Sequence, residues 1–201
     1  MEEFRAAYER ARRRDARTVC VCGFLVMCLL GGVSHFFYDW SGENAVAGIF
    51  FPANESVWEH MKLVFFPAVV FFAVALPLSP RLHNRIYAAF CATYIAAGFI
   101  PVAFYIYTYF AGKSVLAVDI VIFIIGAALG FAVAYRAFTV DNSALLFWLG
   151  TVGIATIMCC YLSLTAFVPD FFLFIDPSDG SSGLQRKALL MRELEMYFTI
   201  R

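Results

Sequence analysis

Charged residues are scarce in this chain of 201 residues. They make up 15% of it, whereas soluble globular domains contain about 25%. The 15 basic and 15 acidic side chains cancel, so the net charge gives no reason to expect a nucleic-acid partner. Long stretches carry almost no charge, and 62% of the residues are hydrophobic. The shortage of charge excludes an ordinary soluble domain and predicts a polytopic membrane protein whose partner is the lipid bilayer.

A disulfide framework, a clear cleavable leader, low-complexity segments and internal repeats are also missing. All six cysteines fall inside predicted spans, where a free thiol acts as a small hydrophobic side chain. The first segment is Arg-rich, and residues 32–34 give only a faint cleavage signal. We therefore expect the first hydrophobic run to stay as an anchor and residues 1–201 to form a single integral membrane domain.

Five hydrophobic runs are long enough to cross a bilayer as helices. We expect an all-α fold, a bundle of about five transmembrane helices with a structured outer loop. The predicted spans cover residues 19–36, 63–78, 86–110, 114–135 and 143–168. Residues 169–201 form an extramembrane or interfacial tail, whose apolar helical stripe consists of Leu190, Leu194, Tyr197 and Phe198. Binding of this stripe to the membrane surface and packing on the core both stay open.

Lysine and arginine are distributed unequally between the two ends of the spans. One side holds Arg5, Arg10, Arg12, Arg13, Arg14, Arg17, Arg81, Arg85 and Arg136. The short loops of the other side hold only Lys62 and Lys113. By the positive-inside rule the N-terminus is cytoplasmic, and we expect a multi-pass protein of the plasma membrane. The first arginines, on a predicted helix over 2–17, set this topology or bind anionic headgroups, and the basic tail conflicts mildly with an outward C-terminus.

The stretch NESVWEHMK, residues 54–62, concentrates ionisable side chains where the second span begins. His60 lies just before that span. His35 follows residues 19–34, which form roughly 24 Å of helix. Both histidines therefore lie near the outer edge of the hydrocarbon, and they meet if the two helices are neighbours. The connection between them has an apolar centre, AVAGIFFPA, with acidic residues and tryptophans around it. This mixture predicts a lid or a segment that dips into the interface.

An ionisable residue also lies inside the fourth predicted span. Asp119 is five residues from the outer end of that span, and such residues are functional-site candidates by default. Tyrosines and hydroxyl side chains of the third and fifth spans share the same outer half. We therefore expect a polar cavity open to the outside. Besides the two histidines, the polar residues assigned to it include Tyr38, Asp39, Ser56, Lys62 and Asp119.

Two histidines with nearby carboxylates suit a divalent metal such as zinc, iron or manganese. His35 and His60 are the predicted metal ligands, and Glu59 or Glu55 is the predicted further ligand or general base. On one helix Glu55 and Glu59 share a face while His60 points about 100° away, so joint ligation requires the loop to bend. A hydrogen-bonded structural cluster and a proton or ion relay are the alternatives.

Some of these residues also have simpler structural interpretations. Ser56 and Glu59 fit a capping box, in which each side chain accepts a free amide at the start of a helix. Asn54 is the alternative cap. Lys62 fits an interfacial anchor that snorkels to water better than it fits a Schiff-base nucleophile.

The segment HFFYDWSGENAVAGIFFPANESVWEHMK, residues 35–62, resembles the signature of a family of uncharacterised small bacterial multi-pass membrane proteins. That signature reads HFxYxWSG followed by PxNESxWEHxK. The segment LFIDPSDGSSG, residues 173–183, is similar to the closing motif of the family, with Ser182 in place of an aromatic residue. The resemblance implies that the segment around Asp176 closes over the same cavity. It implies no activity.

Three functional hypotheses follow from these residues. The first is a polar, metal-binding site at the outer membrane face, which in an enzyme would serve a metal-dependent hydrolase acting on a lipid-like substrate. Glu59 or Glu55 would then be the base for a water held by the metal. The second is a membrane scaffold or partner subunit in which the motif is structural, although no protein partner is indicated. The third is a small proton- or ion-coupled transporter, which the shortage of polar residues in the inner half disfavours.

Overall fold

The computed structural model describes residues 1–178 and 180–183. The apolar stripe predicted for the tail lies outside these residues. The described chain is helical, with elements α1 (Glu2–Ser34), α2 (Phe37–Trp40), α3 (Ala45–Phe50), α4 (Val57–Ala75), α5 (Arg85–Ala111), α6 (Leu116–Thr139), α7 (Ala144–Ala166) and the 3-10 helix η1 (Phe172–Phe174). In the described residues, five helices, α1, α4, α5, α6 and α7, are long and apolar enough to cross a membrane. The chain is thus all-α, with the architecture of a multi-pass membrane protein.

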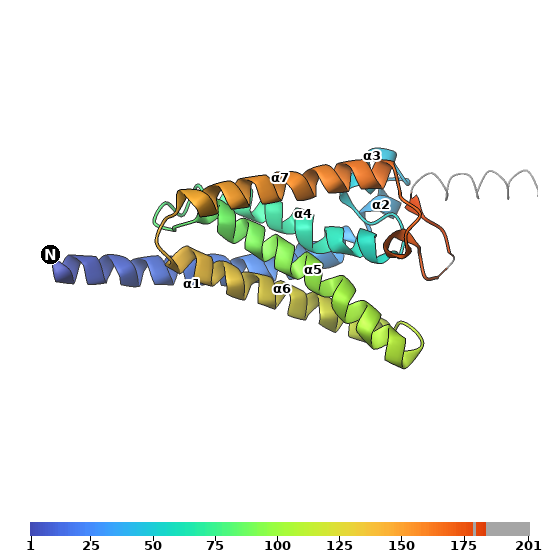
Figure 1. The fold of residues 1–201 in the computed structure, drawn as a ribbon, viewed down its shortest axis with the longest axis horizontal. Helices are drawn as coiled ribbons and strands as arrows, with labels where there is room; N and C mark the ends of the chain where they lie inside the picture. The colour runs from blue at the N-terminus through green and yellow to red at the C-terminus, as the bar shows by residue number, and fades with distance from the viewer. Residues whose placement is uncertain (179, 184–201) are drawn as a thin grey trace, which may run out of the picture.

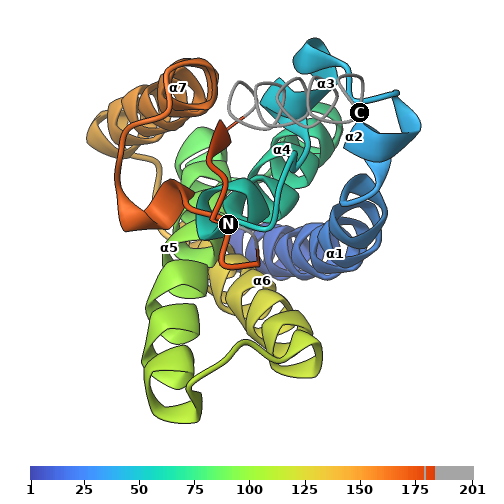
Figure 2. The ribbon, with the colours of Figure 1, turned by 90° about the vertical axis from the view of Figure 1, so that its right-hand side faces the viewer.

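The five long helices form a bundle around α4 and α5 (Figure 1). Helix α4 packs against both α1 and α5, and α6 packs against α1 and α5. Helix α7 lies along one edge of the bundle, where it contacts α5 (Figures 1 and 2). Most of the side chains of α7 stay exposed, as expected for a helix surrounded by lipid. The short helices α2, α3 and η1 gather at one end of the bundle (Figure 1).

Helices α5 and α6 approach closely because small residues line their contact. A Cβ atom at Gly130 would lie 2.3 Å from the carbonyl oxygen of Ala92, and one at Gly126 would lie 3.2 Å from that of Ala96. The four-residue spacing of the two glycines is the small-xxx-small pattern of membrane helix pairs. This contact fixes α5 and α6 as a hairpin, whose turn diverges from α2 and α3 in Figures 1 and 2.

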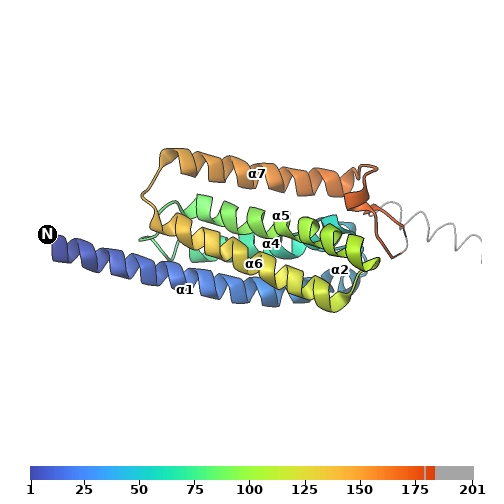
Figure 3. The same ribbon diagram turned by 60° about the horizontal axis from the view of Figure 1, so that its bottom comes forward.

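Helix α1 contains 33 residues and includes the predicted N-terminal helix without a break. At 1.5 Å per residue it is about 50 Å long, and its first turns project beyond the bundle (Figures 1 and 3). Arg12 nevertheless is buried, with 2% of its surface exposed. Its guanidinium donates to Glu9 at 2.6 Å and to the carbonyl of Thr139 at 3.1 Å, and it contacts the ring of His83. Arg12 therefore joins α1 to the end of α6. This structural role is additional to the predicted role of the first arginines in setting the membrane topology.

Candidate functional site

Two short helices occupy the connection between α1 and α4. His35 is the C-cap residue of α1, and helices α2 and α3 follow it directly. The turn between them has positive φ angles at Gly42 and Glu43, 71° and 59°. Asn44 caps α3, because its side-chain oxygen accepts the amide hydrogen of Val46 at 2.8 Å. The predicted outer loop, residues 35–56 between α1 and α4, is thus ordered, and we call it the cover. Helix α3 is its apolar centre.

The first residues of the NESVWEHMK stretch lie outside helix α4. Ser56 is the N-cap residue of α4, and its hydroxyl oxygen accepts the amide hydrogen of Glu59 at 3.4 Å. Asn54 instead accepts the amide hydrogen of Ser56 at 2.9 Å. The Glu59 carboxylate accepts from the amide of Ala53 at 2.9 Å, which lies upstream of the cap. The Ser56 half of the expected capping box is therefore present, and Glu55 precedes the helix.

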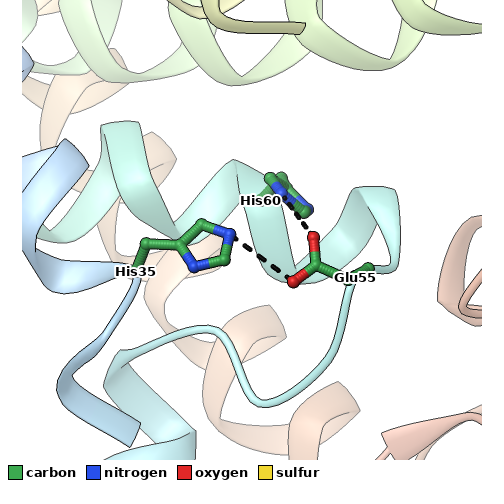
Figure 4. Close-up of side chains that lie close together, drawn as sticks. All are labelled: His35, Glu55 and His60. Carbon is green, nitrogen blue, oxygen red and sulfur yellow. Dashed lines mark ion pairs between the residues drawn. The ribbon is translucent and has the colours of Figure 1, made fainter. Parts of the chain in front are cut away.

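His35, Glu55 and His60 come together at this end of the bundle (Figure 4). One carboxylate oxygen of Glu55 lies 3.6 Å from Nε2 of His35, and the other lies 3.4 Å from Nε2 of His60. The two imidazole rings are 5.3 Å apart between centroids. The backbone bends between Glu55 and the helix, because Ser56 is extended (φ −67°, ψ 152°), so Glu55 and Glu59 do not lie on one helix.

Hydrogen bonds behind the cluster orient two of its members. Nδ1 of His60 lies 3.0 Å from the carbonyl oxygen of Ser56. Because a carbonyl only accepts, Nδ1 donates the hydrogen of this bond, and Nε2 is the ring nitrogen that faces Glu55. The backbone amide of Glu55 donates to the carboxylate of Asp176 at 2.8 Å. Asp176 is buried, with 4% exposed, so it holds Glu55 from the C-terminal segment.

The cluster is open to its surroundings. The side chains of His35 and His60 are 33% and 28% exposed, and that of Glu55 is 51% exposed. The neighbouring Glu55 carboxylate raises the pKa of His35 above its ordinary value, although partial burial opposes the shift. His35 is thus poised to pair as a cation with Glu55, and deprotonation frees it to act as a ligand.

The spacing of the three side chains fits a metal ion. Each offers one ligand atom, and these atoms all lie within 4.8 Å of one another. Ligands about 2.1 Å from a tetrahedral zinc ion lie about 3.4 Å apart, close to the two contacts of Glu55. Imidazole nitrogen with carboxylate oxygen is a donor set that zinc, iron and manganese accept. Small side-chain rotations would therefore complete a three-ligand site with positions left for water.

Glu59 and Lys62 form a separate buried pair. Nζ of Lys62 lies 2.8 Å from the Glu59 carboxylate and also donates to the carbonyl of Gly48 in α3 at 2.8 Å. The two residues are 3% and 1% exposed. The prediction that Lys62 snorkels to water was wrong, because the cover formed by α3 encloses it. Since Lys62 and the Ala53 amide engage the Glu59 carboxylate, Glu55 is the carboxylate that reaches the histidines.

The remaining predicted residues are distributed over several places. Tyr38 and Asp39 both lie on α2, where Tyr38 is buried and Asp39 is exposed. Asp119 accepts a hydrogen bond from the hydroxyl of Tyr107, next to the α5–α6 turn that diverges from the cover (Figure 2). Similar depth along the spans did not bring Asp119 to the histidines, because the close α5–α6 contact directs this hairpin elsewhere.

The C-terminal segment packs over the start of α4. The Trp58 ring lies 4.8 Å from both the Phe174 ring and the Tyr161 ring, measured between centroids. Asp176 continues this segment, and its carboxylate also accepts the amide of Ser178 at 2.7 Å. Composition gave no signal for the contact between Asp176 and Glu55. Only the resemblance of residues 173–183 to a closing motif pointed to it.

Comparison with known proteins places the chain in a family. No curated protein and no solved structure matches the chain. Residues 9–184 match a family described as a family of unknown function (DUF6512). The match includes the cover, the cluster of His35, Glu55 and His60, and the segment that holds Asp176. Because it spans most of the sequence, the chain belongs to this family of unknown function.

Proposed function

We propose that this protein is a membrane metalloprotein in which His35, Glu55 and His60 bind a divalent transition metal, foremost zinc. One observation carries the proposal: three ligand atoms, from the end of α1, the residues just before α4 and the first turn of α4, lie within 4.8 Å of one another. Structural zinc sites use four protein ligands, whereas catalytic sites use three and leave a position for water. Three partly exposed ligands therefore favour a catalytic site.

The reaction that this site supports best is hydrolysis. A bound zinc ion lowers the pKa of its water to about 7. A metal held by His35, Glu55 and His60 would supply such an acidified water as the nucleophile, and an ester would then be split by water into an acid and an alcohol. Glu55 is assigned as a ligand, because it faces both histidines. Glu59 takes no part in this scheme, because it is buried in an ion pair.

An amphiphilic, lipid-like substrate matches the surroundings of the cluster. Phe36 lies 5.5 Å from the His35 ring and 5.9 Å from Trp40, between centroids. These two aromatic side chains are 52% and 70% exposed, beside the end of a helix long enough to span a membrane. Aromatic residues at such a level contact both headgroups and acyl chains. The arginine distribution favours a cytoplasmic N-terminus in the plasma membrane, which puts the cluster on the outer face.

The first test is metal analysis of the detergent-purified protein after loading with zinc and removal of the excess. We expect one equivalent in the parent protein and loss of most of it in a His35→Ala/His60→Ala variant. His83→Ala is the matched control, because it removes a histidine at the other end of the bundle. Cobalt in place of zinc should give visible absorption bands that vanish in the double variant only. Equal metal content in all three proteins would refute the site.

Hydrolysis requires its own test. Parent protein loaded with zinc should cleave a short-chain phospholipid or an amphiphilic ester in mixed micelles, and a chelator should abolish the reaction. The double histidine variant, loaded in the same way, should be inactive. Metal binding without turnover would retain the metal site and reject the hydrolase.

A structural clamp is the second candidate. Glu55 bridges His35 at the end of α1 and His60 in α4, so the cluster joins the two helices without an ion. This alternative predicts no bound metal and a lower melting temperature in the double histidine variant, with function in the cell retained.

A further inference from the structure

A second polar site lies at the opposite end of the bundle, where α5 and α7 both begin. A cavity of about 830 Å³ opens there, lined by residues of α1, of the α4–α5 connection and of the first turns of α5 and α7. Small-molecule sites commonly measure about 300–1,000 Å³. The volume is much larger than an inorganic ion needs, so it suits an organic ligand.

The start of α5 borders this cavity, which Asn84, Arg85 and Ile86 line. Asn84, the N-cap residue, has a left-handed backbone (φ 44°) and makes no side-chain cap hydrogen bond to α5. Its amide nitrogen instead donates to three carbonyls at the end of α6, the nearest being that of Asp141 at 3.0 Å, and its oxygen accepts from the amide of Ser143 at 3.0 Å. Asn84 thus joins the starts of α5 and α7 instead of capping α5. Uncapped amides at a helix N-terminus favour an anion.

Basic side chains at the cavity reinforce this preference. Arg85 lines the cavity and donates to the carbonyl of Leu76 at 3.0 Å. A guanidinium has five N–H donors, so this bond anchors the side chain without exhausting its donors. His83 also lines the cavity, and no acidic side chain does so among the described residues. The site therefore combines a fixed cation with a helix dipole of the same sign.

The rest of the cavity wall is apolar. Leu76, Pro77, Leu82, Ile86 and Phe147 line it together with the polar groups. These residues lie at or beside the ends of helices long enough to span a membrane, where the headgroup of a lipid meets its acyl chains. A water-soluble phosphate would not use this apolar half, whereas a phospholipid uses both halves.

We propose that this cavity binds the phosphate-bearing headgroup of an anionic phospholipid, with Arg85 and the first amides of α5 holding the phosphate. The site is independent of the metal cluster, because it lies at the other end of the bundle (Figure 1). Tyr8 of α1 also lines the cavity, so bound lipid would join α1 to α5 and α7.

The test measures lipid binding by native mass spectrometry on the full chain, titrated with phosphatidylglycerol and with phosphatidylcholine. We expect tighter binding of phosphatidylglycerol by the parent protein. Arg85→Gln should weaken it about fivefold, which is the worth of one basic side chain near anionic lipid, and Arg85→Lys should restore most of it. Arg136→Gln is the matched control, because Arg136 is exposed in the last turn of α6 but does not line the cavity.

Three results would overturn the proposal. One is unchanged phosphatidylglycerol binding in Arg85→Gln, and another is an equal loss in Arg136→Gln, which would indicate general surface charge. The third is inorganic phosphate binding as tightly as the lipid, which would make the ligand a soluble anion. If Arg85→Gln does not fold, Ala144→Trp replaces it: Ala144 is exposed and lines the cavity. The bulky side chain should block lipid without changing the charge, and unchanged binding would again refute the site.

Discussion

Replacement of Lys62 by methionine should destabilise the protein strongly. Lys62 and Glu59 lie 2.8 Å apart and are 1% and 3% exposed, so Lys62→Met leaves a buried carboxylate without its ion-pair partner. Removing one member of a buried pair costs about 3–5 kcal/mol. Lys62 also donates to the carbonyl of Gly48, so the variant loses a contact between α4 and the cover as well. Glu59→Gln should be destabilising for the same reason.

The assay is thermal unfolding in one detergent, followed by a probe of tertiary structure. For a chain of this size about 1 kcal/mol corresponds to roughly 2–4 °C, so each single variant should melt roughly 6–20 °C lower. The double variant Glu59→Gln/Lys62→Met removes both charges and should lose less than the sum of the single losses. Asp119→Asn is a matched control, since its carboxylate is only half-buried, and it should change the melting temperature little.

Additive single effects, or a Lys62→Met variant as stable as the parent, would refute this reasoning. The first result would mean that the two side chains do not interact in the folded protein. The second would mean that Lys62 reaches water, as an interfacial anchor does.

Three other predictions concern the site and the bundle. Because Glu55 raises the pKa of His35, the metal-free pair stabilises the fold below the unfolded histidine pKa of about 6.5. This stability is lost as pH rises through the higher folded pKa, so the melting temperature should fall there in the parent but not in His35→Gln. Asp176→Ala, which removes the acceptor of the Glu55 amide, should weaken zinc binding about 10–100-fold in a competition titration. Gly130→Ala should cost about 1–3 kcal/mol in thermal unfolding, because its Cβ would lie 2.3 Å from a backbone oxygen, whereas Gly98→Ala, which meets open space, should cost nothing.

The helical architecture was predictable because it depends on local properties of the chain. Apolar runs of sufficient length predict the transmembrane spans, and the described structure contains five helices that could cross a membrane. The shared depth of His35 and His60 was also predictable, since rise per residue fixes how far each lies along its helix. Their rings are 5.3 Å apart because α1 and α4 are neighbours. Because α1 and α4 are consecutive long helices, their order in the sequence favours this contact but does not require it.

The choice of carboxylate needed tertiary structure. Glu55 and Glu59 both lie near His60 in the sequence, and a helix beginning earlier would have placed them on one face. The cap at Ser56 puts Glu55 outside α4, where Asp176, more than a hundred residues away, holds its backbone towards the histidines. Glu59 turns instead towards Lys62 and the cover. Such contacts join segments distant in sequence, so no local pattern encodes them.

The sequence by itself therefore determined the lengths of the apolar helices and the candidate residues of the motif, because both follow from side-chain chemistry and helix geometry. Only the tertiary structure decided that Asp119 accepts a hydrogen bond from Tyr107, that Arg12 is buried, and that α5 and α7 begin at a common cavity. These outcomes depend on which helices touch and at what angle. Close contacts such as that of Gly130 with Ala92 set those angles, and their energies are decided only when the whole bundle packs.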